Sequence, residues 1–208
     1  MTLLPRRALI VVDVQNEYVT GNLRIEYPPV SSSLANIGLA MDTARAARIP
    51  VIVVQHHAPE DSPVFARGSN GWELHPEVAT RPHEHRIEKT LPSAFAKTDL
   101  GDWLARHEID TLTVVGYMTH NCDASTIVDA VHRGLSTELL ADATGAVSYR
   151  NDAGTASAED IHRVFSVVLH SGFAAVASTQ AWIEAVQAQR GLVRCNIVAS
   201  NQAARAAM

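Results

Sequence analysis

Three side chains in this 208-residue sequence, those of Asp13, Lys89 and Cys122, could together carry out acyl transfer. Acyl transfer needs a nucleophile, a general base and a stabilising cation, and a thiol, a carboxylate and an ammonium supply them. Each of the three residues lies near or just after the end of a predicted strand. Ligands bind beyond the carboxyl ends of strands in open parallel sheets, so we expect these residues to converge there.

Cys122 is the most suggestive of the three. It follows the segment GYMTHN after an apolar run and opens a helical pattern. Its sulfur is therefore expected near the positive end of a helix, which favours the reactive thiolate. The alternative is a small buried hydrophobe. Cys195, in the C-terminal tail, has no such context and is predicted to be inert.

Asp13 interrupts an apolar run where a strand should still be buried. A desolvated carboxylate costs several kcal/mol unless it is paired, so Asp13 needs either a partner or a role. Capping of a turn at the end of the strand is the alternative explanation. Lys89 taken alone is uninformative, because most lysines are solvated surface residues.

Short apolar runs alternate with helix-period segments, which predicts a parallel α/β sheet. The predicted strands cover residues 8–14, 51–55, 85–89, 111–117, 136–142 and 173–178. Helices are predicted at 33–48, near 100–107, at about 122–133, after a capping Ser157 and around 182–186. The helix predicted at about 122–133 places Cys122 on the first turn of a regular helix. Residues 161, 164, 165, 168 and 169 form an apolar stripe that is expected to be buried.

These elements predict a three-layer α/β/α architecture with a doubly wound, mainly parallel, six-stranded sheet. We interpret residues 1–208 as a single domain, with the tail after about residue 191 unassigned.

Composition excludes several other classes of protein. With 17 basic and 22 acidic residues, the net charge of −5 lacks the basic excess of a nucleic-acid-binding domain. No apolar run approaches the ~20 residues that cross a bilayer, and the first run is too short for a signal peptide. Two cysteines are too few for a disulfide framework. A cytoplasmic location is therefore expected.

Four segments resemble those of the isochorismatase-like cysteine hydrolases, the superfamily that contains nicotinamidase, N-carbamoylsarcosine amidase and isochorismatase. In chain order they read ALIVVDVQNEY, EKTLPSAFAKTDL, VVGYMTHNCDASTIVDAVHRG and LLADATGA. The resemblance runs from residue 8 to about residue 182. Each segment alone is weak, but four in the same order on the expected elements are specific.

The resemblance implies a catalytic triad of Cys122 as nucleophile, Asp13 as general base and Lys89. It also implies a cis peptide bond before Met118, and an oxyanion hole formed by the backbone N–H groups of Met118 and Cys122. Substrate-binding residues are expected at Gln15, Tyr18, Trp72 and Tyr117. Core packing is the alternative for the two tyrosines, and anchoring of its loop is the alternative for Trp72.

Two positions depart from the family pattern. Nicotinamidases carry a metal site that begins Asp-x-His, whereas this chain has Gln55 followed by two histidines. A neutral amide is a poor ligand for such a cation, so no metal and no cofactor are expected. An unrelated site could use His57, His75, His83 and His85, although a solvated loop is the preferred explanation. Asp123 stands where the family often has Val. It could tune the thiol, contact a polar substrate, or simply favour the helix N-terminus.

The implied activity is hydrolysis of a small amide or carbamoyl C–N bond through a thioester on Cys122. The alternatives are vinyl-ether hydrolysis of the isochorismatase type and a catalytically silent binding protein. A nucleotide-binding module is disfavoured because no G-x-G-x-x-G follows the first strand, and a serine hydrolase because no G-x-S-x-G is present. The expected partners are a small amide and further copies of the chain, with no nucleic acid and no membrane.

Overall fold

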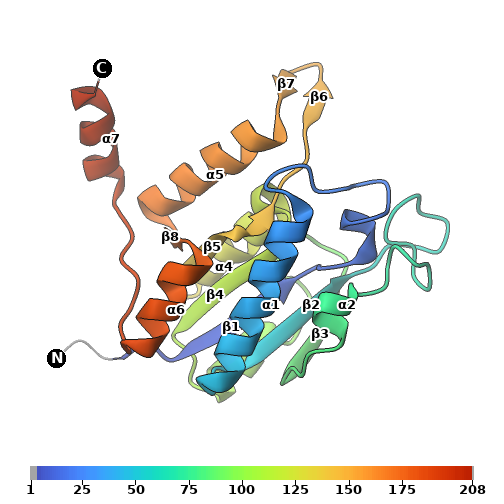
Figure 1. Ribbon diagram of the computed structural model, residues 1–208, viewed down its shortest axis with the longest axis horizontal. Coiled ribbons are helices and arrows are strands. Elements are labelled where there is room, and N and C mark those ends of the chain that lie inside the picture. Colours follow the sequence, from blue (N-terminus) through green and yellow to red (C-terminus); the bar gives the residue numbers. More distant parts are fainter. Residues whose placement is uncertain (1–3, 208) are drawn as a thin grey trace.

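A six-stranded parallel sheet forms the centre of the protein in the computed structural model, which describes residues 4–207 (Figure 1). The strands are β1 (Arg7–Val12), β2 (Val51–His56), β3 (His85–Lys89), β4 (Thr111–Tyr117), β5 (Ser136–Gly145) and β8 (Ala175–Ala177). Their order is β3-β2-β1-β4-β5-β8, and every neighbouring pair is parallel. The predicted α/β architecture is confirmed, with β3 and β4 at the predicted bounds.

Helices cover both faces of the sheet, which explains why the central strands β1 and β2 are nearly continuous apolar runs. One face packs against α1 (Val30–Ala46) and α6 (Thr179–Gln187). The other packs against α3 (Leu100–Arg106), α4 (Ala124–His132) and α5 (Ala158–Gly172). Alternate residues of β1 divide between the two faces, Leu9 and Val11 on the first and Ile10 on the second. Within residues 4–207, no helix combines the length and the apolar character needed to cross a membrane.

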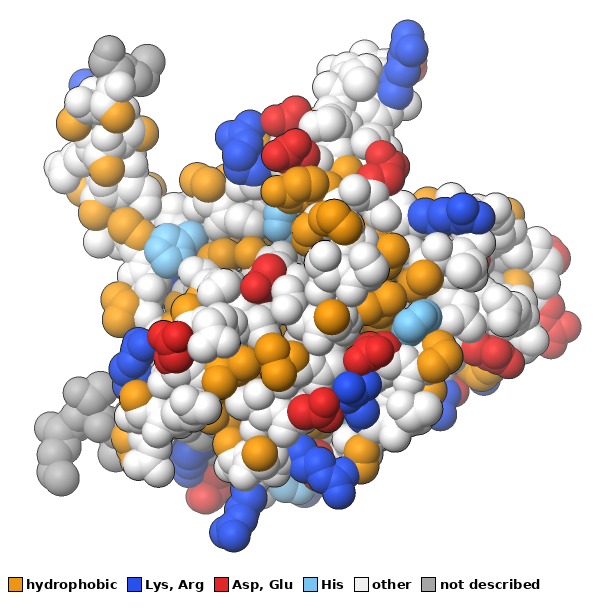
Figure 2. Space-filling view, in the orientation of Figure 1, with side chains coloured by type: hydrophobic (Ala, Val, Ile, Leu, Met, Phe, Trp, Pro, Cys, Tyr) orange, Lys and Arg blue, Asp and Glu red, His pale blue; other side chains and the backbone are white. Residues whose placement is uncertain are grey.

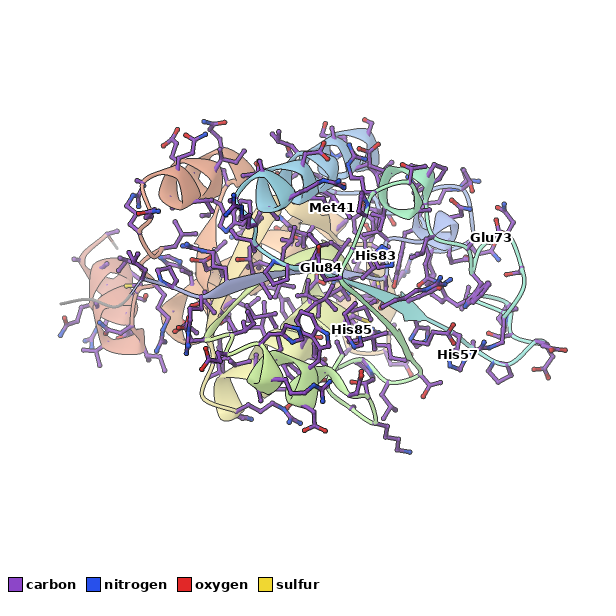
Figure 3. The ribbon with its side chains drawn as sticks, turned by 90° about the horizontal axis from the view of Figure 1, so that it is seen from below. Met41, His57, Glu73, His83, Glu84 and His85 are labelled. Carbon is purple, nitrogen blue, oxygen red and sulfur yellow. The ribbon has the colours of Figure 1, made fainter. Side chains whose placement is uncertain are left out.

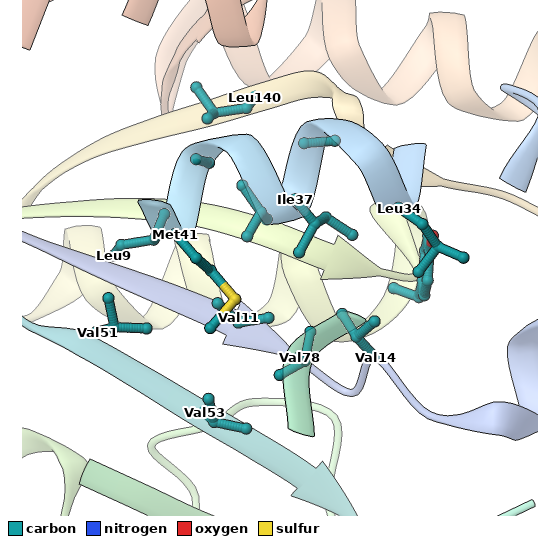
Figure 4. Packing of buried hydrophobic residues seen from close by; sticks show 14 of the residues in the cluster. Leu9, Val11, Val14, Leu34, Ile37, Met41, Val51, Val53, Val78 and Leu140 are labelled. Carbon is teal, nitrogen blue, oxygen red and sulfur yellow. The ribbon is translucent and has the colours of Figure 1, made fainter. Parts of the chain in front are cut away.

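The apolar side chains on one side of α1 pack against the central sheet and form part of the core. Ile37 and Met41 point toward Leu9 and Val11 of β1, and Val51 and Val53 of β2 lie alongside (Figure 4). Full burial of each large apolar side chain contributes roughly 1.5–3 kcal/mol. This packing fixes β1 and β2 as a rigid base for the segments that follow them.

Several elements were not predicted. A five-residue π-helical turn, η2 (Thr119–Asp123), precedes α4, so the predicted regular helix from Cys122 begins instead at Ala124. The short helices η1 (Asn16–Tyr18) and α2 (Pro76–Ala79) and the hairpin of β6 (Tyr149–Asn151) and β7 (Gly154–Ala156) also lacked a clear pattern. Elements of three or four residues are too short to show an apolar period.

The C-terminal helix α7 (Ile197–Ala206) stands away from the sheet on the side of α5 (Figure 1). None of its residues is buried. The predicted apolar stripe of α5 is also largely uncovered, since Val164 and Val168 are 46% and 49% exposed while Leu169 is buried. Ser157 caps α5 as predicted, accepting a hydrogen bond from the Asp160 N–H at 3.1 Å.

Candidate active site

The three chemically promising side chains lie together at the carboxyl edge of the sheet. The Lys89 Nζ is 2.6 Å from the Asp13 Oδ2 and donates a hydrogen bond to the Cys122 Sγ at 3.2 Å. Lys89 ends β3, Asp13 follows β1, and Cys122 lies in the turn after β4. All three residues are buried, and Cys122, at 5% exposed, is the least enclosed of them.

Asp13 leaves the strand with a sharp change of backbone direction. Its φ is +52°, in the left-handed region that Asp tolerates better than most residues. Its N–H still donates to the Val54 carbonyl at 3.0 Å, which holds the turn against β2. Within residues 4–207, neither carboxylate oxygen has a hydrogen-bond partner beyond the ion pair with Lys89. The carboxylate can therefore accept a proton from a neighbouring group.

The electrostatics of the site favour a protonated thiol at rest. Burial and the Asp13 carboxylate raise the pKa of the Cys122 thiol, and the Lys89 ammonium offsets only part of this. The expectation of a stable thiolate at a helix end was therefore wrong, because desolvation and a nearby negative charge outweigh the helix. Burial tends to lower the pKa of Lys89, but its contacts with Asp13 and Cys122 raise it overall, so Lys89 stays an ammonium.

The turn between β4 and α4 shapes the backbone around the sulfur. The Tyr117–Met118 peptide bond is cis, and the Met118 carbonyl accepts hydrogen bonds from the N–H groups of Asn121 and Asp123 at 3.0 and 3.2 Å. Just before this turn, Gly116 has a φ of +116°. A Cβ at Gly116 would lie 2.7 Å from the Val12 nitrogen and 2.8 Å from its carbonyl carbon. Glycine thus allows β4 to approach the end of β1, which brings the Cys122 turn beside Asp13.

Of the predicted substrate-binding residues, Tyr18 and Tyr117 pack against each other with ring centroids 5.4 Å apart. Tyr117 is fully buried, and its hydroxyl lies 2.8 Å from the Ser33 hydroxyl. Tyr117 therefore packs as a core residue that holds the Tyr18 ring in place. Burial raises the pKa of Tyr18, and the charges of Cys122 and Asp13 raise it further.

The other two, Gln15 and Trp72, belong to one hydrogen-bonded loop. The Gln15 amide donates to the carbonyls of His56 at 2.9 Å and Trp72 at 2.6 Å, and accepts from the His56 N–H. Its amide is thus used to hold the loop on β2. The Trp72 Nε1 is buried and has no hydrogen-bond partner in the described part of the chain. We therefore expect the Trp72 side chain to face a ligand. Gln15 would hold Trp72 in place rather than bind the ligand itself.

Gln55, which stands where the family's metal motif has an acidic residue, also forms side-chain hydrogen bonds. It donates to the Trp72 carbonyl at 2.7 Å and accepts a hydrogen bond from Arg86. His83 and His85, labelled with His57 in Figure 3, form separate local contacts, His83 with the Arg81 carbonyl and His85 with Asp99. Across residues 4–207, no three His, Cys, Asp or Glu side chains are grouped so as to hold a metal ion.

Further residues near the site were not predicted as site residues. His56 has a buried Nδ1 without a partner among the described residues, and burial and the Lys89 charge lower its pKa. The His120 Nε2 lies 2.9 Å from the Tyr149 hydroxyl, and burial lowers the pKa of His120 to about 4, so it is neutral. The pair lines a surface cavity of about 430 Å³ with Phe165. His120 could have been predicted as a site residue, because it lies in the segment GYMTHNC that contains Cys122. Tyr149 could not, because it lies on the hairpin that was not predicted.

Comparison with known proteins agrees with this fold. The crystal structure of an isochorismatase homologue from Burkholderia xenovorans LB400 is 69% identical and covers 98% of both chains, with a TM-score of 0.97. A cysteine hydrolase from Pseudomonas syringae pv. phaseolicola 1448A is 28% identical over 88% of this chain and 93% of its own, with a TM-score of 0.82. Nicotinamidase of Escherichia coli K12 is 27% identical over 67% of this chain and 83% of its own length.

The isochorismatase domain matches residues 7–189, which include every strand of the central sheet and the three clustered side chains. The protein is therefore a member of the isochorismatase family of hydrolases.

Proposed function

We propose that the protein hydrolyses small amide- or carbamoyl-type C–N bonds, with Cys122 as nucleophile, Asp13 as general base and Lys89 as the cation that holds both. The observation that carries this proposal is the position of the Lys89 ammonium, 2.6 Å from Asp13 and 3.2 Å from Cys122 in a nearly closed site. Similarity to a cysteine hydrolase and to a nicotinamidase supports the same class of chemistry.

In the first half of the reaction, Asp13 takes the proton of Cys122 while the sulfur attacks the carbonyl carbon. This order suits a thiol whose pKa is raised, because the base removes the proton only as the bond forms. The negative charge on the carbonyl oxygen is stabilised by the N–H groups of Met118 and Cys122. Asp13 then gives its proton to the leaving nitrogen, and an amine or ammonia departs.

In the second half, water attacks the thioester and Asp13 accepts a proton from it. Collapse of the intermediate breaks the C–S bond, releases a carboxylic acid and restores the thiol. Lys89 stays protonated throughout and keeps the Asp13 carboxylate ionised and oriented. The proposed reaction uses only groups of this chain and water.

Reduced thiols suit this chemistry. Cys122 and Cys195 are both free cysteines, and oxidation of Cys122 would remove the nucleophile. We therefore infer that the protein works in the reducing cytoplasm, and its net charge of −5 favours a small molecule over nucleic acid as its substrate.

The test is an ammonia-release screen over small amides and ureido acids, run on protein treated exhaustively with a chelator. We expect activity to survive chelation and to fall about 10³-fold or more in Cys122→Ala. Cys195→Ala is the matched control and should retain full activity. Near-normal turnover by Cys122→Ala would contradict the proposed mechanism, and loss of activity on chelation would contradict its independence from metal.

A further inference from the structure

Glu17, on η1, is a buried carboxylate that the proposed mechanism does not use. It is 4% exposed, and its Oε1 accepts hydrogen bonds from the backbone N–H groups of Asn22 and Leu23 at 2.5 and 3.2 Å. A buried charge is costly unless it is hydrogen-bonded, and bonds from backbone N–H groups to a carboxylate are among the stronger ones. Glu17 therefore closes residues 17–23 into a compact loop.

Two glycines from different segments make room for the Glu17 side chain. A Cβ added at Gly21 would lie 2.6 Å from the Glu17 Oε1, and a Cβ added at Gly71 would overlap the Oε2. Chain neighbours aside, the three atoms nearest to the added Cβ at Gly71 all belong to the Glu17 side chain. Neither glycine has a positive φ. The need for glycine at position 71 therefore comes from the Glu17 carboxylate and not from backbone conformation.

Backbone hydrogen bonds extend this contact between the two segments. The Glu17 N–H donates to the Gly71 carbonyl at 3.0 Å. The Asn16 N–H donates to the Glu73 carbonyl at 2.9 Å. These two carbonyls belong to the residues on either side of Trp72, so η1 holds the backbone of Trp72 from both sides.

Both segments begin at the candidate active site. Residues 14–23 follow Asp13, and residues 57–75 follow β2, where the His57 N–H donates to the Lys89 carbonyl at 3.0 Å. Trp72 is partly exposed, and its Nε1 has no hydrogen-bond partner in the described part of the chain. A partly exposed aromatic ring on a fixed backbone is typical of the wall of a ligand pocket.

We propose that Glu17 is a positioning residue for substrate binding, which holds residues 57–75 against η1 and so keeps the Trp72 indole in place beside the candidate active site. Without its carboxylate, the space between Gly21 and Gly71 is empty and the loop is no longer held there. Glu17 acts through Trp72, so its loss should weaken substrate binding more than bond breaking. The kinetic consequence rests on the proposed hydrolase function, whereas the position of Trp72 does not.

Fluorine NMR of protein labelled with 5-fluorotryptophan tests the position of Trp72 without a substrate. The chain has three tryptophans, and Trp72→Phe identifies the resonance of Trp72. Glu17→Ala should shift or broaden that resonance and leave those of Trp103 and Trp182 unchanged. An unchanged Trp72 resonance in the Glu17→Ala protein would overturn the proposal.

Two further variants show whether the hydrogen-bonding side chain is what matters. Glu17→Gln keeps a side-chain carbonyl that can accept from the same N–H groups, and should restore the parent resonance. Glu60→Ala, which removes an exposed acid from the same loop, is the matched control and should leave the Trp72 resonance unchanged. Equal effects of Glu60→Ala and Glu17→Ala would mean that the loop responds to any substitution, and would overturn the role of Glu17.

A double-substitution cycle tests the contact with Gly71 itself. Gly71→Ala should lower the melting temperature by about 3 °C or more, because the new Cβ overlaps the carboxylate. In the Glu17→Ala background the same substitution should lower it by less than about 1 °C, because the overlapping atoms are gone. Equal shifts in the two backgrounds would contradict the contact on which the proposal depends.

Ammonia release from malonamide and from N-carbamoylglycine then separates substrate binding from a merely structural role. For each probe that the protein turns over, Glu17→Ala should raise KM about tenfold or more and change kcat less than about threefold, and Glu17→Gln should restore KM. A fall in kcat at unchanged KM would overturn the role in binding. If the wild-type protein turns over no amide, the proposed function fails, and the Trp72 resonance still decides whether Glu17 holds Trp72.

Discussion

At the scale of single residues, the buried ion pair between Lys89 and Asp13 should contribute both to the free energy of unfolding and to the proposed reaction. Both side chains are shielded from solvent and their charged atoms are 2.6 Å apart. Removal of one member leaves the other charge buried and unpaired, which typically costs about 3–5 kcal/mol. Lys89→Met should therefore lower the free energy of unfolding by about that amount, measured by urea denaturation, and abolish ammonia release.

The chain offers a matched control, because its other lysine, Lys97, is exposed. Lys97→Met should change stability by less than about 0.5 kcal/mol. If the two variants unfold at the same urea concentration, the ion pair makes no net contribution to the folded state.

The two cysteines should differ in reactivity in the opposite sense to the sequence expectation. Burial and Asp13 raise the pKa of Cys122, whereas hydrogen bonds, first that from the Ser200 side chain, lower the pKa of the accessible Cys195. Below its pKa a thiol loses about tenfold in thiolate for each pH unit. Iodoacetamide at neutral pH should therefore label Cys195 first, as read by peptide mass spectrometry.

In a Cys195→Ser background, labelling of Cys122 should keep rising beyond the ordinary thiol pKa of about 8.5. Amide hydrolysis should already be high at neutral pH, because Asp13 removes the proton during attack. Coincident pH profiles for labelling and hydrolysis would show that a preformed thiolate is the reacting species.

At the scale of secondary-structure elements, the approach of β4 to β1 depends on Gly116. An added Cβ would meet the backbone of Val12, which cannot move without breaking the sheet. Gly134, in the loop after α4, also has a positive φ, of +85°, but an added Cβ there meets nothing within 4 Å. Gly134→Ala should cost about 1 kcal/mol and Gly116→Ala more than about 4 kcal/mol, measured by chemical denaturation. Equal costs would mean that backbone conformation, not the close approach, sets the requirement for glycine.

Elements buried on both faces were the most predictable from sequence. The strand Thr111–Tyr117 has the predicted bounds, because burial selects uninterrupted β-branched and apolar residues. The edge strand His85–Lys89 also has the predicted bounds, although only two of its residues, Ile87 and Lys89, are buried. The last two residues of the turn η2, Cys122 and Asp123, were predicted as the start of a regular helix, since π and α turns have similar composition. The positions of Asp13, Lys89 and Cys122 followed from strand ends and motif spacing. The proton affinity of the thiol did not, because it depends on burial and on distances that no local pattern encodes.

At the scale of the whole molecule, the chain leaves apolar surface uncovered at one end. Val167 of α5 is 62% exposed, and Ile197 and Val198 of α7 are 68% and 64% exposed. Figure 2 shows hydrophobic side chains on the projecting arm formed by α7. The apolar stripe of α5 was recognised in the sequence, but its expected burial is not found, because the chain itself supplies little to cover it. Exposed apolar clusters of this kind mark association surfaces.

We therefore expect the protein to self-associate through α7 and α5. Sedimentation velocity should give a mass that is a multiple of 22.5 kDa. Ile197→Asp combined with Val198→Asp should shift the protein toward the monomer, because each charge would have to be desolvated at the interface. Asn201→Asp with Gln202→Asp adds the same charge to exposed polar positions of the same helix and should have little effect. A wild-type protein that sediments as a monomer would show that the arm is free in solution.

Since α7 lies outside the matched domain, the monomeric variant should keep its activity per chain.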